Sequence, residues 1–319
     1  MSLAAAKVEA LRPAFMQSMP VKLERMFDDP DQIMDIIKQR APYQSVAAYH
    51  NMSERSVATQ PWFRTNFSDD LFLNNPRWIE SAKQSFNAKI VRPQRCLLNV
   101  NGPMAGGGVH VDLPSFRGFT PANAPVRFLM NMGMSGLFNS WMIPIASGLA
   151  WFFRGEGGEF EYLADGTDSP PRVQGELWNT GVMSDNEFMW HSVRAIGTPE
   201  DQAQIKSVME RDCLLHYAGD EHWEIRAGDR VAARLGPKQT RFSLLWKAHV
   251  FLDEDHLASF ENPAMSLSLD QIVDIYLDDL SAKGVAARRP DDPLNDTAWR
   301  DLLEKTNPPP IHQAASEKS

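Results

Sequence analysis

Short runs of alternating apolar and polar residues dominate the middle of the chain, from residue 89 to about residue 253. Gly, Pro, Asn and Asp separate these runs at close intervals, which is typical of β-strands joined by turns. Many short strands at such spacing favour a sandwich or a jelly roll. We therefore expect a mainly β core with the jelly-roll architecture over residues 89–253.

The N-terminal part, residues 1–88, is expected to be a helical flank. Residues 4–40 have a helical pattern that breaks at Pro20. The segment 76–86 is a second expected helix, because Pro at its first position suits a helix start. Residues 41–75 show no regular pattern and are expected to be irregular.

The C-terminal part, residues 254–319, returns to a helical pattern. Ser268 and Gln271 have the spacing of a capping box ahead of an apolar helical run. Gly284 is suited to end that helix. The chain has no internal repeat and no long linker, so we expect residues 1–319 to form a single domain.

Composition narrows the class of protein. The formal net charge of −9 argues against a nucleic-acid partner, because phosphate binding relies on clustered Lys and Arg. The only two cysteines, Cys96 and Cys213, lack the paired spacing of a disulfide framework or zinc ribbon, which fits a reducing cytoplasm. The longest apolar stretch, residues 141–153, is broken by Pro144 and is too short to span a bilayer. We expect a cytoplasmic protein outside the membrane, and its oligomeric state stays open.

The most informative motif is His110-Val111-Asp112. In a strand, positions i and i+2 point to the same face, so both side chains can reach one metal ion. A second imidazole, His191, follows 81 residues later in another strand-like segment. Two imidazoles and a carboxylate suit an Fe(II) site with open coordination positions, whereas structural zinc usually takes four protein ligands.

Two further motifs follow, and their order along the chain is informative. The run Gly157-Gly158-Glu159-Phe160 comes after His-x-Asp, and Arg241-Phe242-Ser243 comes after the second histidine. Over roughly residues 90–250 this succession resembles the Fe(II)/2-oxoglutarate-dependent dioxygenases. The resemblance implies a double-stranded β-helix, cupin-like core that uses Fe(II), 2-oxoglutarate and O2. It also implies roles for five residues: iron ligation by His110, Asp112 and His191, and binding of the distal 2-oxoglutarate carboxylate by Arg241 and Ser243.

One feature departs from the family pattern. Arg241 lies 50 residues after His191, whereas the family's arginine commonly follows the distal histidine much more closely. Residues 198–240 would then be an insertion between two neighbouring strands, and we expect it to cover the iron pocket as a lid. Three other arginines are alternatives for the same role but lack the Arg-x-Ser context: Arg194, Arg230 and Arg234.

Four residues are secondary candidates. Asn99 and Asn101 alternate with apolar neighbours, so both are expected to face the site. Asn99 is a candidate contact of 2-oxoglutarate and Asn101 of the substrate, although a water-exposed strand face is an equal alternative. Arg117 and Trp141 are candidate substrate contacts, with surface solvation and ordinary core packing as the respective alternatives.

These observations favour an oxygenase that hydroxylates a C–H bond of a small molecule and releases succinate and CO2. The resemblance implies hydroxylation, desaturation or ring closure and not halogenation, because the family's halogenases carry a small residue where this chain has Asp112. Three alternatives stay open: a metal-dependent cupin-type enzyme that does not use 2-oxoglutarate, a non-catalytic binding module on the same fold, and a role in assembly. The sequence does not identify the substrate.

Overall fold

The computed structural model describes residues 18–50 and 59–309. Its strands are β1 (Val21–Leu23), β2 (Tyr43–Ser45), β3 (Trp62–Asn66), β4 (Ile90–Asn101), β5 (Ile145–Phe152), β6 (Phe160–Tyr162), β7 (Arg172–Gln174), β8 (Trp178–Ser184), β9 (His191–Val193), β10 (Leu214–Gly219), β11 (His222–Ala227), β12 (Arg230–Leu235) and β13 (Arg241–Phe251). Its helices are α2 (Pro30–Gln39), α3 (Val46–Tyr49), α5 (Asp70–Leu73), α6 (Pro76–Phe86), α7 (Val126–Ser135), α8 (Pro199–Val208), α9 (Glu254–Glu261), α10 (Leu269–Ala282) and α11 (Thr297–Thr306), with 3-10 turns η1 (Asn139–Trp141) and η2 (Pro263–Met265).

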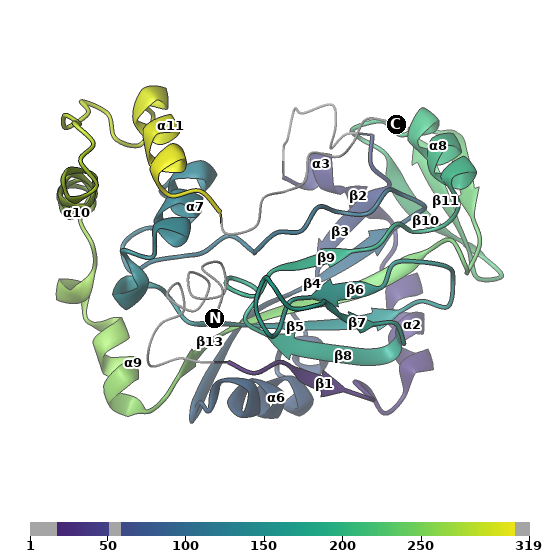
Figure 1. Cartoon of the computed structure of the whole chain (residues 1–319). Coiled ribbons are helices and arrows are strands. Elements are labelled where there is room, and N and C mark those ends of the chain that lie inside the picture. The colour runs from purple at the N-terminus through teal and green to yellow at the C-terminus, as the bar shows by residue number, and fades with distance from the viewer. Residues whose placement is uncertain (1–17, 51–58, 310–319) are drawn as a thin grey trace.

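Two antiparallel sheets lie face to face (Figure 1). The large sheet has the order β1-β8-β5-β13-β4-β3-β2-β10-β11-β12, and the small sheet has the order β7-β6-β9. Along the chain, β4, β5, β8 and β13 of the large sheet alternate with segments of the small one, and His110 joins the small sheet by a bridge to His191. This alternation makes a jelly roll, so the expected fold class is confirmed.

Strand β13 shows how the sequence builds the two faces of the large sheet. Its even positions, including Leu244 and Trp246, are buried in the core beneath α2 and α6. Trp246 stacks on Trp78 of α6 with ring centroids 5.9 Å apart. Successive side chains of a strand point to opposite faces, so the odd positions face the small sheet. Those odd positions are Arg241, Ser243, Leu245 and Lys247.

The N-terminal part is only partly helical. Helix α6 is confirmed, with Asn75 as its N-cap, and α2 begins at Pro30. The rest of that expectation is wrong, because β1, β2 and β3 add three strands to the large sheet. The helix expected from residue 4 to residue 17 lies outside the described residues.

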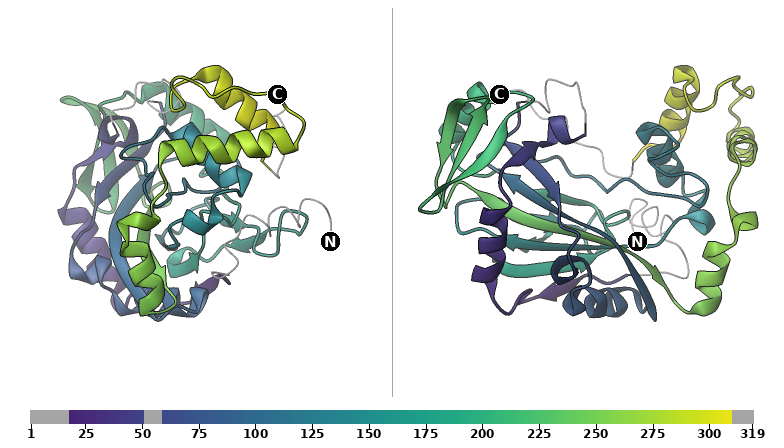
Figure 2. Two further views of the ribbon diagram at one scale, coloured as in Figure 1. Left: turned by 90° about the vertical axis from the view of Figure 1, so that its left-hand side faces the viewer. Right: turned by 180° about the vertical axis from the view of Figure 1, so that it is seen from behind.

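The C-terminal helices form a second hydrophobic core with α7. The capping box at Ser268 and Gln271 is present, and Gly284 follows α10 with a left-handed φ of 73°, as the sequence predicts. Tyr276 of α10 packs against Trp299 of α11 and Phe138. This helical layer lies at one end of the molecule, and α8 with β10–β12 lies at the other (Figure 2).

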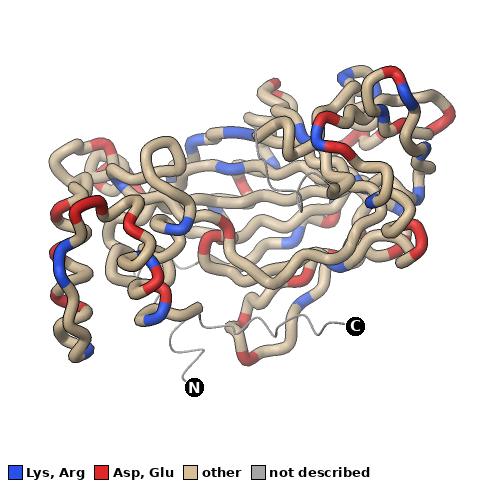
Figure 3. Tube along the Cα trace, turned by 90° about the horizontal axis from the view of Figure 1, so that it is seen from above, with Lys and Arg blue, Asp and Glu red and all other residues tan. Residues whose placement is uncertain are grey.

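Charged residues of both signs occur at both ends of the molecule (Figure 3). Among the described helices, none combines the length and the apolar character that crossing a membrane requires.

Candidate active site

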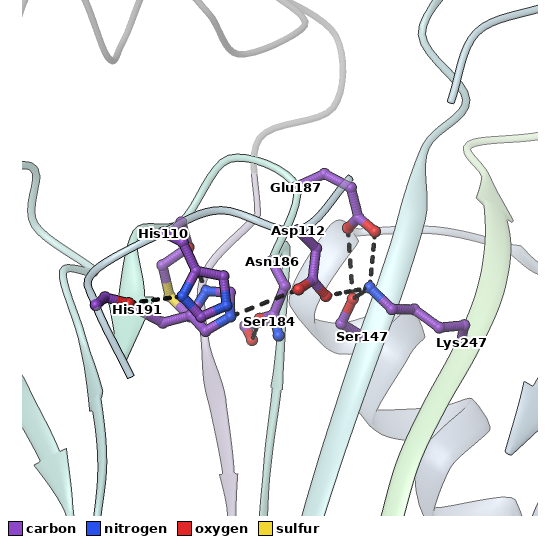
Figure 4. Close-up of polar contacts among 10 residues, drawn as sticks. His110, Asp112, Ser147, Ser184, Asn186, Glu187, His191 and Lys247 are labelled. Atoms are coloured by element: carbon purple, nitrogen blue, oxygen red, sulfur yellow. Dashed lines mark hydrogen bonds and ion pairs between the residues drawn. The ribbon is translucent and has the colours of Figure 1, made fainter. Parts of the chain in front are cut away.

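The three predicted metal ligands come together between the sheets (Figure 4). His110 and His191 exchange two backbone hydrogen bonds, each with an N–O distance of 2.9 Å, which fixes the two imidazoles side by side. One ligand atom from each of His110, Asp112 and His191 lies within 4.8 Å of the other two. The Nε2 atom of His191 is 3.7 Å from Oδ1 of Asp112.

Backbone carbonyls orient both imidazoles. Nδ1 of His110 lies 2.8 Å from the Gly108 carbonyl oxygen, and Nδ1 of His191 lies 2.9 Å from that of Met189. A neutral ring that donates from Nδ1 leaves the Nε2 lone pair for a metal. Burial lowers the pKa of His191 to about 4, which favours the neutral ring. This donor set fits Fe(II), because the chain supplies two imidazoles, one carboxylate and no thiolate.

A buried lysine holds the second oxygen of the metal carboxylate (Figure 4). Nζ of Lys247 donates to Oδ2 of Asp112 at 2.6 Å, to Oε1 of Glu187 at 2.7 Å and to Oγ of Ser147 at 2.7 Å. Lys247 and Glu187 are almost fully buried. Since the ammonium occupies Oδ2, Asp112 has Oδ1 to offer to a metal.

Burial and charge act on this cluster in both directions. Burial, with the Asp112 charge, raises the pKa of the Glu187 carboxyl despite the nearby Lys247 ammonium. Burial raises the pKa of the Asp112 carboxyl, but the Lys247 ammonium and the His191 imidazole outweigh it and hold that pKa below its ordinary value. Burial lowers the pKa of Lys247, but the carboxylates of Asp112 and Glu187 outweigh it and raise that pKa. Glu187 comes from the turn before β9 and was not among the predicted site residues.

A cavity of about 290 Å³ opens beside the three ligands. Its polar lining follows the register of the large sheet, in which neighbouring strands align their inward-facing positions. One row aligns Arg64, Asn99, Ser243 and Trp151 across β3, β4, β13 and β5, and the next aligns Trp62, Asn101 and Arg241. Asn99 and Asn101 both line the cavity, on the strand face that their alternation predicts.

Arg241 is 3% exposed and lines the same cavity. Its Nε donates to the Gly158 carbonyl oxygen at 3.0 Å, and no described carboxylate pairs with it. Burial lowers the pKa of Arg241 to about 10, so the guanidinium is charged at neutral pH. Gly158 has a φ of +71°, and a Cβ there would lie 2.8 Å from Cδ of Arg241. The second glycine of the Gly-Gly motif therefore makes room for the arginine.

The alternative arginines are all engaged with carboxylates. Arg194 borders the cavity but pairs with Glu161 at 2.6 Å. The other two lie in the outer strands, where Arg230 pairs with Glu210 and Arg234 pairs with Glu224. Among the four candidates, Arg241 is the buried one that forms no ion pair with a described carboxylate, although the Glu159 charge acts on it from farther away.

Arg117, Trp141 and the segment 198–240 lie outside the cavity lining. Arg117 does not line the cavity; it donates to the carbonyl oxygens of Ser140 and Ser259, because the chain leaves the sheet after Pro114. Trp141 packs against the helical core. No residue from 198–240 lines the cavity. In this structure the segment does not cover the cavity, because β10 pairs with β2 and so continues the large sheet.

Arg64 also lines the cavity and was not among the predicted site residues. Its Nε donates to Oδ1 of Asn99 at 2.7 Å, and its Nη1 lies 2.7 Å from Nε2 of His50. The guanidinium lies over the ring of Trp62, 4.8 Å from its centroid, and Trp62 donates to the same Asn99 oxygen at 3.1 Å. The alternation within residues 62–66 was the available signal, since a strand there places Trp62 and Arg64 on one face.

No protein-family model and no curated protein matches this sequence. Among solved structures, the chain is similar to an oxidoreductase of the 2OG-Fe(II) oxygenase family from Burkholderia pseudomallei, at 15% identity and a TM-score of 0.39 over 78% of this chain and 90% of that one. A prolyl-4-hydroxylase from Pseudomonas putida matches at 11% identity and a TM-score of 0.37 over 78% and 99%. HygX from Streptomyces hygroscopicus, with nickel, 2-oxoglutarate and hygromycin B bound, matches at 7% identity and a TM-score of 0.36 over 78% and 88%. At similarities this low, the function has to be argued from the geometry of the cavity.

Proposed function

We propose that this protein is an Fe(II)- and 2-oxoglutarate-dependent oxygenase that hydroxylates a C–H bond of a small molecule and releases succinate and CO2. One observation carries the proposal: the metal-binding triad and a buried arginine without a described carboxylate partner line the same cavity. A buried guanidinium is stable only with an anionic partner, and a carboxylate matches its planar geometry best.

The chain's own residues have distinct tasks in this proposal. His110, Asp112 and His191 hold the metal on one wall. Arg241 and Ser243 bind the distal carboxylate of 2-oxoglutarate, and Asn99 offers its amide nitrogen beside them. When bound, Fe(II) with 2-oxoglutarate supplies the oxidising chemistry, and the protein supplies orientation and a pocket that excludes water.

Lys247 positions the metal carboxylate. Because its ammonium donates to Oδ2 of Asp112, only Oδ1 is directed to the metal. This arrangement keeps the carboxylate in one geometry before the metal binds. Metal sites are commonly tuned by such neighbours of the ligands.

The volume of the cavity bears on the size of the substrate. Its volume of about 290 Å³ is near the lower end of small-molecule sites and supports a small molecule as substrate. We further propose a reducing compartment such as the cytoplasm, because Cys96 and Cys213 are buried free thiols.

The proposal is tested by anaerobic reconstitution with Fe(II) and 2-oxoglutarate. The wild type should develop a weak visible charge-transfer band, because 2-oxoglutarate chelates the metal through its keto and C1 carboxylate oxygens. His110→Ala, Asp112→Ala and His191→Ala should each remove the band, whereas His222→Ala, at the exposed start of β11, should keep it. Retention of the band in all three ligand variants would refute the metal site. Iron binding without any change on addition of 2-oxoglutarate would instead favour a cupin-type enzyme.

A further inference from the structure

Arg64 has no described carboxylate partner. It is half-buried on β3 and lines the same cavity as the triad. Its hydrogen bonds with described residues go to neutral groups, the Asn99 amide oxygen and the His50 ring. A charge held partly out of water without a counter-ion is unfavourable, so its position is explained by an anion that binds there.

Two of the three arginines that line the cavity have no carboxylate partner among the described residues. Arg194 is neutralised by Glu161, so Arg64 and Arg241 are those two. The Asp112 charge acts on Arg64 without an ion pair between them, and its Oδ2 already pairs with Lys247.

The guanidinium of Arg64 is already oriented. Asn99 accepts from Nε, the Trp62 ring supports one face, and His50 contacts Nη1. No described residue accepts a hydrogen bond from Nη2. A preorganised guanidinium with a free edge binds a carboxylate with little loss of side-chain freedom.

The rest of the cavity lining is largely apolar. Its apolar residues come from both sheets and from the loop after β4: Met104, Leu149, Trp151, Phe160, Ile196 and Leu245. Such walls bind a hydrocarbon body, whereas the polar groups fix its orientation.

We infer that the substrate is a small organic acid, whose carboxylate pairs with Arg64 while its apolar body extends toward the metal triad. This inference rests on the proposed function, because it assigns the distal carboxylate of 2-oxoglutarate to Arg241. A planar guanidinium with one edge open among the described residues matches the planar carboxylate. Arg64 is thus the residue that selects the substrate class.

The test uses protein loaded with Co(II) and saturating 2-oxoglutarate, in which turnover does not interfere. Straight-chain carboxylic acids from butanoate to octanoate are titrated by calorimetry, each beside the primary amide of the same length. The wild type should bind at least one acid about tenfold more tightly than its amide, on the scale of one charge-assisted hydrogen-bonded pair. Arg64→Gln should abolish this preference, and Arg64→Lys should retain part of it.

A matched control is Arg194→Gln, which changes a cavity arginine that already has a carboxylate partner. It should keep the preference for acids. The affinity for 2-oxoglutarate should stay within about twofold of the wild type in Arg64→Gln and fall at least tenfold in Arg241→Gln, because one charged pair is worth about that much. Circular dichroism should confirm that each variant is folded.

The outcomes separate this inference from the function on which it rests. If no acid binds more tightly than its amide, or if the preference survives in Arg64→Gln, the inference is wrong. If Arg64→Gln loses 2-oxoglutarate and Arg241→Gln does not, Arg64 binds the co-substrate and the inference is also wrong. If neither variant affects 2-oxoglutarate, the proposed function fails, and the acid preference is then measured with Co(II) alone.

Discussion

Lys247 joins two carboxylates that would otherwise repel each other. Its ammonium lies 2.6 Å from Asp112, whose side chain is 26% exposed, and 2.7 Å from the buried Glu187. Removing one member of a buried ionic cluster leaves charge without compensation, which costs more than the loss of an exposed pair. The lysine thus affects the stability of the fold as well as the metal site.

Lys247→Met keeps the length of the side chain and removes its charge. We expect the free energy of unfolding of the metal-free protein to fall by about 3–5 kcal/mol, measured by urea denaturation. Lys89→Met, at an exposed position, should change it by less than about 0.5 kcal/mol. Adding Glu187→Gln to Lys247→Met should restore part of the loss, because one buried charge fewer remains. A Lys247→Met protein as stable as the wild type would contradict this account.

Residue spacing predicted the metal ligands but not their neighbours. His110 and Asp112 lie two positions apart at the His110–His191 bridge, and that relation is local in sequence. Lys247 contacts Asp112 across 135 positions, and Arg64 contacts Asn99 across 35. Such pairs depend on which strands become neighbours, and no local pattern carries that information. Arg241 could be predicted because its Arg-x-Ser context was recognisable beside the alternatives.

The segment 198–240 acts as an extension of the large sheet. Strand β10 pairs with β2, and Trp223 of β11 is 1% exposed. The Trp223 ring stacks on Tyr43, with centroids 6.1 Å apart, and packs against Phe242 at 5.3 Å. These contacts tie the segment to β2 and to β13, which carries Arg241.

Trp223→Ala tests whether this extension is integral to the fold. We expect the free energy of unfolding to fall by about 3–5 kcal/mol, because the substitution leaves a large cavity in a packed core. His222→Ala, at the neighbouring exposed position, should have little effect. Hydrogen exchange of β10–β12 should be the same with and without 2-oxoglutarate. Protection of β10–β12 that appears only with 2-oxoglutarate would instead support a segment that closes over the cavity.

Helices whose ends are marked by local sequence signals were predicted correctly. The Pro at the start of α6 and the capping box of α10 act within one helical turn, so they are visible in the sequence. Strands β1, β2 and β3 have only three to five residues each. Their identity comes from the strands beside them, which explains why the sequence suggested a helical or irregular flank.

At the scale of the whole molecule, partly buried histidines link stability to pH. Burial lowers the pKa of His249, and the Arg92 charge lowers it further. Burial likewise lowers the pKa of His50, His216 and His256. The unfolded chain, with histidine pKa values near 6.5, then binds more protons than the folded one as the pH falls below about 7. Stability is present above this range and is lost as the pH falls through the lowered values.

His249→Gln should therefore make the free energy of unfolding less dependent on pH between about 7 and 5. The measurement is urea denaturation at a series of pH values in the presence of a chelator. Since only the slope is compared, a constant loss of stability in the variant does not affect the result. Identical slopes for the variant and the wild type would show that His249 does not contribute.

The Asp112–Lys247 ion pair connects the metal side of the cavity to the large sheet that also carries Arg64. The proposed anchor and the proposed metal are therefore held at a constant separation by one hydrogen-bonded framework. A constant separation sets regiochemistry: the carbon presented for oxidation is counted from the charged end of the molecule and not from its tail. Within a homologous series of acids, the new hydroxyl would keep its position relative to the carboxylate while the tail grows.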